Sequence, residues 1–250
     1  MHIAAAAFAF APALAIGSFL NVGAARLPMQ RSIVQPRSAC QSCQTELRWQ
    51  DNIPIVSYLA LGGRCRTCSE HFSVRYPLVE LTTALLVAAC FLRYGLSGQA
   101  IVGAFFVSVL VVLSAIDIEH LILPDKIVLP SFVIVLVANI SFFPDRTIEW
   151  VIAALGPSLF LFLALLAYPR GMGMGDVKLA LLLGAALGWT VAVGMLIGMI
   201  AAVGFGALMM MQHGLNARKK ATPFGPFLAF GAIVTHFAGD AILNAYTGTF

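Results

Sequence analysis

Eight long apolar runs limit what this chain can fold into more than any other feature. A helix that crosses a bilayer needs roughly 20 mostly apolar residues. Of the 250 residues, 60% are hydrophobic, and the mean hydropathy is +0.92. This exceeds what one soluble core buries, so we predict an all-α polytopic membrane helix bundle. The candidate spans are Ile3–Val22, Pro77–Tyr94, Ile101–Ile116, Ile127–Phe143, Ile148–Tyr168, Val177–Leu187, Val191–Met211 and Phe224–Ala245.

The number of spans depends on the sixth run, which is short and is separated from the seventh only by "LGWT". Seven spans are therefore the alternative to eight. The first run could be mistaken for a secretory signal, but only Met1 and His2 precede it, without Lys or Arg. We interpret it as a retained helix whose amino end faces outward.

The basic residues support one orientation in the membrane. With the amino terminus outside, all of the fifteen Lys and Arg except Arg93 and Arg146 fall on the inner side, including Arg170 and the run at 218–220. Short inner loops retain such residues. The net charge of +4 is then mainly a topology signal. The sequence contains no stripe of basic residues interleaved with aromatic residues, so we expect the protein to contact membrane lipids and not nucleic acid.

The only long polar stretch, Arg26 to Tyr76, carries two CxxC pairs, "CQSC" and "CRTC". Two such pairs can complete a tetrahedron of thiolates around a structural zinc ion. A redox dithiol or free thiols are the alternatives, but the sequence between the pairs suggests a short looped insert, and a cytoplasmic location disfavours disulfides. The expected zinc ligands are Cys40, Cys43, Cys65 and Cys68. We divide the chain into a first helix (1–22), this cytoplasmic insert (23–76) and a helix bundle (77–250).

Three acids lie close to the ends of apolar runs on the same predicted face. Asp117 lies in "AIDIEHLILPD" and Asp176 in "GMGMGDVKLA", and an ionisable group at that depth is a candidate for function. Two adjacent carboxylates can share a proton, one acting as base toward water and the other as acid toward a carbonyl. Glu80 in "RYPLVELTTA" could equally be a structural partner or part of a site.

Helix dipoles are expected to disfavour negative charge on one aspartate and to favour it on the other. Asp117 follows the run that ends at Ile116, so we place it at a helix carboxyl end, where negative charge is disfavoured. Asp176 precedes Val177 and should lie at an amino end, where free amides favour the carboxylate. On this premise Asp176 is the better base.

A series of motifs then adds a family resemblance. In order they are "GSFLNVGAARLP", the paired CxxC motifs, "NIPIVSYLALGGRCRTC", "RYPLVELTTA", "DIEHLILPD", "GMGMGDVKL" and "PFGPFLAFG". The series resembles the type 4 prepilin peptidases, inner-membrane aspartyl proteases of the GxGD class in bacteria. The resemblance implies that Asp117 and Asp176 are catalytic. They would cleave the leader peptide of prepilins or secretion pseudopilins, as used in type IV pili and type II secretion, at the cytoplasmic membrane face.

The same resemblance implies a second activity. In this family the four-cysteine insert is associated with members that methylate the new amino terminus using S-adenosylmethionine. Gly63 matches a position linked to methyl transfer, and Glu80 is a further candidate for binding the methyl donor.

Two functions of other classes compete with this interpretation. In a transporter, Asp117 and Asp176 would carry protons or bind a cation between helices. A zinc-stabilised assembly factor would use the insert to recruit a partner, with the acids merely structural. Nothing in the sequence suggests paired repeats, and transport gives no reason for a four-cysteine insert.

Overall fold

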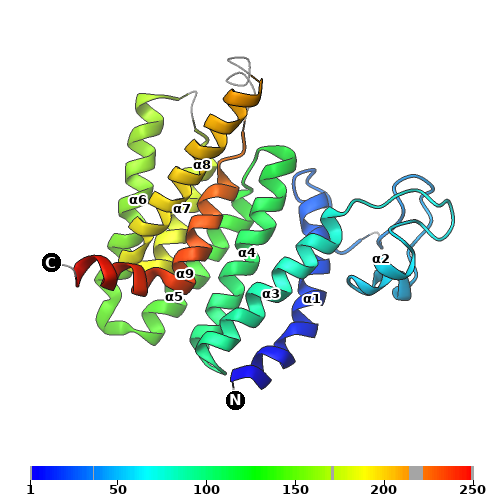
Figure 1. Ribbon diagram of the computed structural model, residues 1–250, viewed down its shortest axis with the longest axis horizontal. Helices are drawn as coiled ribbons and strands as arrows, with labels where there is room; N and C mark the ends of the chain where they lie inside the picture. The colour runs from blue at the N-terminus through cyan, green and yellow to red at the C-terminus, as the bar shows by residue number, and fades with distance from the viewer. Residues whose placement is uncertain (1, 36, 170–171, 214–221, 249–250) are drawn as a thin grey trace. The chain divides into compact units, whose positions relative to one another are not determined.

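The computed structural model describes residues 2–35, 37–169, 172–213 and 222–248, and these ranges contain helices and no β-strand. This confirms the predicted all-α class. The long helices are α1 (His2–Arg26), α3 (Arg75–Tyr94), α4 (Gly98–His120), α5 (Asp125–Phe142), α6 (Thr147–Ala167), α7 (Met174–Leu187), α8 (Val191–His213) and α9 (Gly225–Thr247) (Figure 1). The short ones are η1 (Trp49–Asn52), α2 (Val56–Ala60), η2 (Pro144–Arg146) and η3 (Gly188–Thr190).

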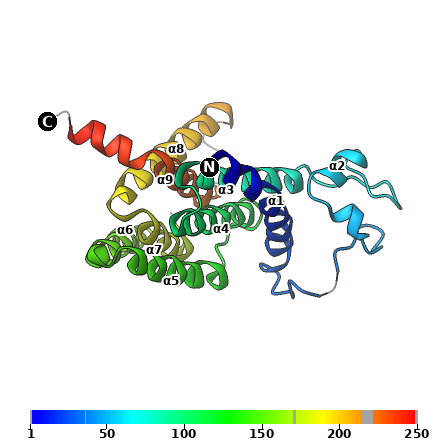
Figure 2. The ribbon, with the colours of Figure 1, turned by 90° about the horizontal axis from the view of Figure 1, so that it is seen from below.

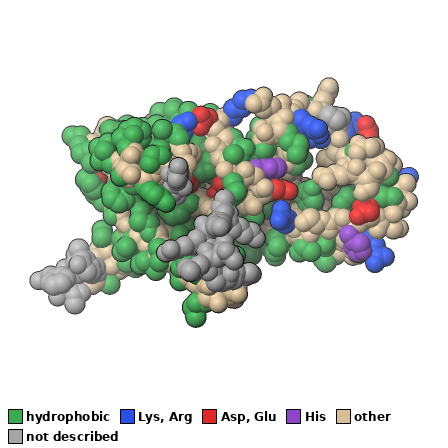
Figure 3. Space-filling model, turned by 90° about the horizontal axis from the view of Figure 1, so that it is seen from above, with side chains coloured by type: hydrophobic (Ala, Val, Ile, Leu, Met, Phe, Trp, Pro, Cys, Tyr) green, Lys and Arg blue, Asp and Glu red, His purple; other side chains and the backbone are tan. Residues whose placement is uncertain are grey.

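Within the described residues, seven helical segments are long and apolar enough to cross a membrane, so the chain is a multi-pass membrane protein. Hydrophobic side chains cover much of the helical surface in Figure 3. At a rise of about 1.5 Å per residue, α7 is about 21 Å long, shorter than the hydrocarbon core. It forms one continuous apolar segment with α8, Met174–Gln212. The predicted boundary at "LGWT" coincides with η3. Because α7 and α8 count as one apolar segment, the eight long helices give seven segments.

The chain divides into two compact units, Met1–Val112 and Leu113–Phe250, and the division falls inside α4. In the first unit, α1 and α3 pack as an antiparallel pair. The Asn21 side chain donates to the Tyr76 carbonyl (3.0 Å), and the His2 ring lies 2.9 Å from the Leu92 carbonyl at the other end. Gly17 allows the close approach, because a methyl group there would lie 2.6 Å from the Glu80 Cα.

In the second unit, α7 is the most enclosed helix, and α5 and α6 lie beside it (Figure 2). Two buried side-chain hydrogen bonds hold these neighbours. Asn139 of α5 donates to the Ala185 carbonyl (2.8 Å), and Ser158 of α6 donates to the Val177 carbonyl (3.0 Å). Gly184 brings α7 against the Ala153 backbone of α6. Because α7 is clamped on both sides, its amino end has a defined position.

Several helices extend beyond the apolar runs from which they were predicted. α1 continues beyond Val22 to Arg26, and α4 continues beyond Ile116 to His120. Leu121 then adopts a positive φ of 55° and donates its N–H to the Asp117 carbonyl. This is the left-handed ending that glycine usually provides, and no glycine marks it in the sequence. The insert, predicted as a loop, contains the helical turns η1 and α2.

Four of the basic residues used for the topology prediction, Arg170 and the three at 218–220, lie outside the described residues, as does Gly171 of the glycine motif.

Candidate active site and metal centre

Asp117 lies in the last turn of α4 and is 5% exposed. Its Oδ2 atom accepts a hydrogen bond from the backbone N–H of Gly225 at 2.9 Å. Gly225 is the first residue of α9, so the amino end of a second helix faces this carboxyl group. A methyl group at Gly225 would lie 2.8 Å from the same oxygen, which explains why glycine is needed there.

Asp176 is the third residue of α7 and is 8% exposed. Its Oδ2 atom accepts the N–H of Gly173 at 3.2 Å, while its own N–H donates to the Gly173 carbonyl at 3.1 Å. This reciprocal pair satisfies amides that a helix start otherwise leaves free. The predicted placement of Asp176 at a helix amino end is therefore confirmed.

The structure brings the two aspartates together in the second unit. The Asp117 carboxyl group is close enough to Asp176 for their charges to interact. Leu123, from the segment after α4, contacts the elements that hold both. A methyl group at Gly175 would lie 2.9 Å from Leu123 Cβ, and one at Gly225 would lie 3.3 Å from Leu123 Cδ2. Leu123 thus packs against both the start of α7, which carries Asp176, and the start of α9, which donates to Asp117.

The prediction that helix dipoles act oppositely on the two aspartates was wrong, because it considered only the helix that carries each aspartate. Asp117 is indeed in the last turn of α4, but that helix continues for three more residues, and the amino end of α9 donates to its carboxylate. Both aspartates therefore face helix amino ends, which favour negative charge. Helix dipoles alone do not decide which is the base.

Gly225 and Leu123 contribute to the aspartate site, but the sequence did not lead us to predict either of them as a site residue. Both lie in quoted motifs, "PFGPFLAFG" and "DIEHLILPD". The available signal was a glycine followed by a proline at the start of an apolar run, typical of a helix amino end. In the structure, Gly173 caps α7 and Gly175 packs on Leu123.

A surface ion pair lies beside this site. Lys178 Nζ, two residues after Asp176, is 2.6 Å from Oδ2 of Asp125, the first residue of α5. It links the starts of α5 and α7.

The second site is the four-cysteine cluster of the first unit. The ligand atoms of Cys40, Cys43, Cys65 and Cys68 all lie within 4.8 Å of one another. The Cys40 and Cys68 sulfur atoms are 3.7 Å apart, and those of Cys43 and Cys65 are 3.9 Å apart. The four predicted ligands thus meet, and they could hold a metal ion.

Each CxxC pair is presented by the same small hairpin. The bridge Ala39–Glu46 closes the first, and Arg64–His71 closes the second. In each hairpin the residue after the second cysteine, Gln44 (φ 57°) or Ser69 (φ 60°), has a left-handed backbone and donates its N–H to the first cysteine's carbonyl. Two copies of one local turn therefore build the cluster.

The protein environment shifts the pKa values of the Cys43 and Cys68 thiols in opposite directions. The side chain and backbone of Thr45 hold the pKa of the Cys43 thiol down, at about 6. For Cys68, the backbone hydrogen bond with Glu70 favours the thiolate, but desolvation and hydrogen bonds with the three neighbouring thiols raise its pKa to about 12. A bound cation would be needed for all four sulfurs to be thiolates.

The two remaining predicted site residues lie elsewhere in the first unit. Buried Glu80 of α3 accepts the N–H of Ile55 at 2.8 Å. Ile55 has a φ of 60°, which is costly for a β-branched residue, so Glu80 stabilises the start of α2. Gly63 (φ 68°) packs against the Tyr58 ring, where a methyl group would lie 2.8 Å away. Their roles toward a methyl donor remain predictions.

Comparison with known proteins then decides the family. Residues 12–94 match the bacterial peptidase A24 N-terminal domain, and residues 104–211 match the type IV leader peptidase family. The chain belongs to the type IV leader peptidase family. Both aspartates lie in the leader peptidase match, whereas the four cysteines, Gly63 and Glu80 lie in the N-terminal match.

Relatives named prepilin leader peptidase/N-methyltransferase are similar to this leader peptidase family member over most of its length. The Bacillus subtilis protein is 32% identical over 93% of this chain and 94% of its own length. The Pseudomonas aeruginosa protein is 36% identical over 93% and 90%. The Myxococcus xanthus protein is 39% identical over 84% of this chain and 64% of its own length. No solved structure matches significantly.

Proposed function

We propose that this protein removes the leader peptide from type 4 prepilins or pseudopilins, with Asp117 and Asp176 as its catalytic pair. The observation that carries the proposal is the meeting of two buried carboxylates from α4 and α7 in a leader peptidase family member. Buried acids that approach each other at the end of membrane helices are costly for stability and are characteristic of function.

The chemistry follows from sharing one proton between the two carboxyl groups. One aspartate, as carboxylate, takes a proton from water while the water oxygen attacks the scissile carbonyl carbon. The other, protonated, donates to the carbonyl oxygen. Collapse of the tetrahedral intermediate breaks the C–N bond, and a proton returns to the leaving amine. The Gly225 and Gly173 amides orient the two carboxyl groups for these transfers.

We assign the metal as one structural zinc ion. With Zn–S bonds of about 2.3 Å, a tetrahedron places its sulfur atoms about 3.8 Å apart. The separations of 3.7 and 3.9 Å fit this requirement. Zinc would hold the two hairpins together and thereby the insert, since their closing bridges are single residue pairs.

Methylation of the new amino terminus is the second proposed activity, located in the N-terminal domain. Its donor, S-adenosylmethionine, supplies an activated methyl group on a sulfonium cation. The cavity between α1 and the insert is lined by Arg26, Arg37 and Arg48 and by no acid. This lining does not suit a sulfonium cation, so we derive no step through it.

The proposed location is the bacterial inner membrane, with the active site toward the cytoplasm. α4 and α6 end, and α5 and α7 begin, on one side, so Asp117 and Asp176 share a face, and short basic loops favour the cytoplasm for it. The proposed partners are prepilin or pseudopilin leader peptides and membrane lipids, with no nucleic acid. Family membership leaves the transporter alternative unsupported.

The test is to incubate the purified protein in lipid nanodiscs with a prepilin and to follow the substrate by mass spectrometry. We expect a product shortened by its leader and, with S-adenosylmethionine present, heavier by one methyl group. A substrate that remains intact with wild-type protein, in nanodiscs that contain folded, metal-loaded chain, would contradict the proposal. An assembly factor would bind the prepilin without shortening it.

A further inference from the structure

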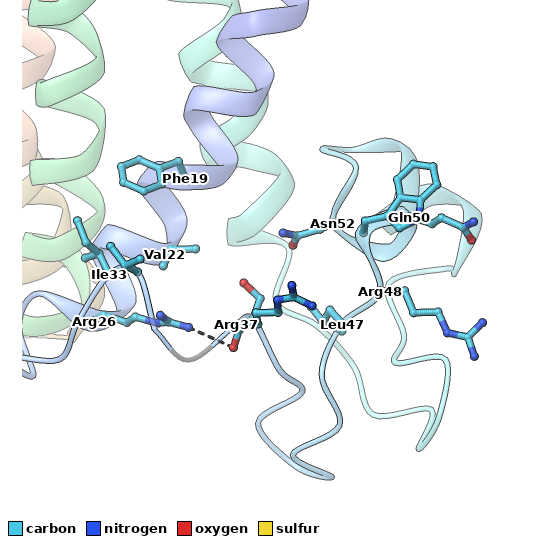
Figure 4. Close-up of a pocket in the computed structure, with 12 residues that line it drawn as sticks. Phe19, Val22, Arg26, Ile33, Arg37, Leu47, Arg48, Gln50 and Asn52 are labelled. Carbon is cyan, nitrogen blue, oxygen red and sulfur yellow. Dashed lines mark hydrogen bonds between the residues drawn. The ribbon is translucent and has the colours of Figure 1, made fainter.

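In the first unit, a cavity of about 720 Å³ lies between the carboxyl end of α1 and the insert (Figure 4). One wall is the last two turns of α1, and the other is formed by the loop after α1, by η1 and by the two arms of the first CxxC hairpin. Those arms are joined by the hydrogen bond from the Leu47 N–H to the Ser38 carbonyl, 2.8 Å. The cavity therefore connects a membrane helix with the zinc-binding insert.

The polar part of this cavity is positively charged. Arg26, Arg37 and Arg48 line it without any acidic residue. The Arg26 guanidinium donates to the Ser32 carbonyl (3.1 Å) and the Arg37 carbonyl (3.4 Å), which fixes its position. Figure 4 shows the Arg37 side chain facing Asn52 across the space, whereas Arg48 extends outward at the rim. Among the described residues, no carboxylate forms an ion pair with Arg37.

The other part of the cavity is apolar and open. Phe19 and Val22 of α1 line it, about two turns and one turn, respectively, before Arg26. Val34 and Trp49, from the loop and from η1, are each 77% exposed although they are large and hydrophobic. Exposed tryptophan and arginine at the end of a membrane-spanning helix are typical of the headgroup region of a bilayer.

We propose that this cavity binds an anionic membrane phospholipid. The phosphate lies on Arg37 and Asn52, with Arg26 adding charge, and the glycerol and acyl chains follow Phe19 and Val22 along α1. Guanidinium groups bind phosphate with two parallel hydrogen bonds, and basic pockets at the ends of membrane helices suit lipid headgroups. Free phosphate would leave the apolar wall uncovered, and a cationic methyl donor would meet three like charges.

Such a lipid would hold the insert against the membrane. Its headgroup would contact α1 through Arg26, the start of the first hairpin's chain through Arg37 and η1 through Asn52, so one ligand bridges the two walls. This inference concerns the first unit alone and does not depend on the proposed peptidase chemistry.

Native mass spectrometry of the detergent-purified full chain can test the proposal by titration with phosphatidylglycerol and phosphatidylcholine. We expect one phosphatidylglycerol to bind in preference to phosphatidylcholine. Arg37→Gln should weaken that binding by about tenfold, because a charge-assisted pair is lost, and Arg48→Gln at the rim should weaken it less. Arg31→Gln is the matched control, since Arg31 lies in the same loop, carries the same charge and does not line the cavity.

Several outcomes would overturn the proposal. Equal binding of the two lipids, or equal loss from Arg31→Gln and Arg37→Gln, would indicate only diffuse surface charge. Binding of inorganic phosphate with the same affinity would remove the role of the apolar wall. Displacement of phosphatidylglycerol by S-adenosylmethionine would assign the cavity to the methyl donor. Zinc content, measured on every variant, shows whether the insert is still folded, and Arg37→Lys provides a second, milder variant.

Discussion

The four-cysteine cluster and the aspartate pair are built in opposite ways. Cys40 and Cys68, the outermost ligands, are 28 positions apart, and each half of the cluster is a short hairpin with its own hydrogen bonds. Asp117 instead depends on Gly225, 108 positions away, and on a bundle that fixes α4, α7 and α9. One site is assembled from local turns, whereas the other exists only once long-range helix packing is complete.

This difference predicts how the sites fail. A local site held by a metal should be lost when one ligand is removed, while the helix bundle persists. A site made by packing should lose its chemistry to small changes of geometry, while the metal remains bound. The two activities of the protein should therefore be separable by substitution.

The largest effect is expected for Asp117→Asn and Asp176→Asn. Each should lower the rate of leader cleavage by about 10²–10⁴-fold or more, because an amide can neither accept nor donate the shared proton. Prepilin cleavage by purified variants provides the measurement, with zinc content expected to stay at the wild-type value. Substantial cleavage by Asp117→Asn would reject the pair, and Asp125 would then be the next acid to substitute.

Loss of zinc is expected to have the second largest effect. This effect should fall on the first unit, which contains the four-cysteine cluster. Cys65→Ser should reduce bound zinc from about one ion per chain to nearly none and should abolish methylation while reducing cleavage much less. Metal analysis and both product assays test this. Cys90→Ala is the control, because this buried cysteine of α3 is not in the cluster. Equal loss of both activities would show that the units do not function separately.

Gly225→Ala tests the aspartate site by changing its geometry without removing a carboxyl group. The added methyl group would lie 2.8 Å from Asp117 Oδ2, and displacement of a reacting group by about 1 Å can cost about 10²-fold. We expect cleavage to fall by about 10–10²-fold, with zinc binding and methylation unchanged. Gly204→Ala, where a methyl group meets nothing within 4 Å, should leave cleavage at the wild-type rate. Full activity of Gly225→Ala would mean that Asp117 tolerates movement.

The same contrast explains what could be predicted from the sequence. The cysteine spacing was sufficient to identify the cluster, since each CxxC hairpin forms locally. Apolar runs were sufficient for the helices, although not for their ends, because the turn that stops α4 uses Leu121 in place of glycine. The approach of the α9 amino end to Asp117 could not be predicted, since packing between distant helices leaves no periodic signal. Sequence reasoning therefore placed the aspartates on one face and missed the contacts of Leu123 and Gly225 at the site.

The smallest effect is expected for the ion pair beside the aspartates. Lys178 is 29% exposed and Asp125 is 54% exposed, and pairs of this kind contribute about 0–1 kcal/mol because water screens them. Lys178→Ala should therefore reduce cleavage by less than about fivefold, despite lying two residues from Asp176, and added salt should shrink the difference further. The exchanged pair Asp125→Lys with Lys178→Asp should recover most of the loss if the link between α5 and α7 is what matters. A loss as large as that of Asp176→Asn, not recovered by the exchange, would instead give Lys178 a direct part in the chemistry. In that case the active site would extend beyond the two buried carboxylates to the exposed start of α7.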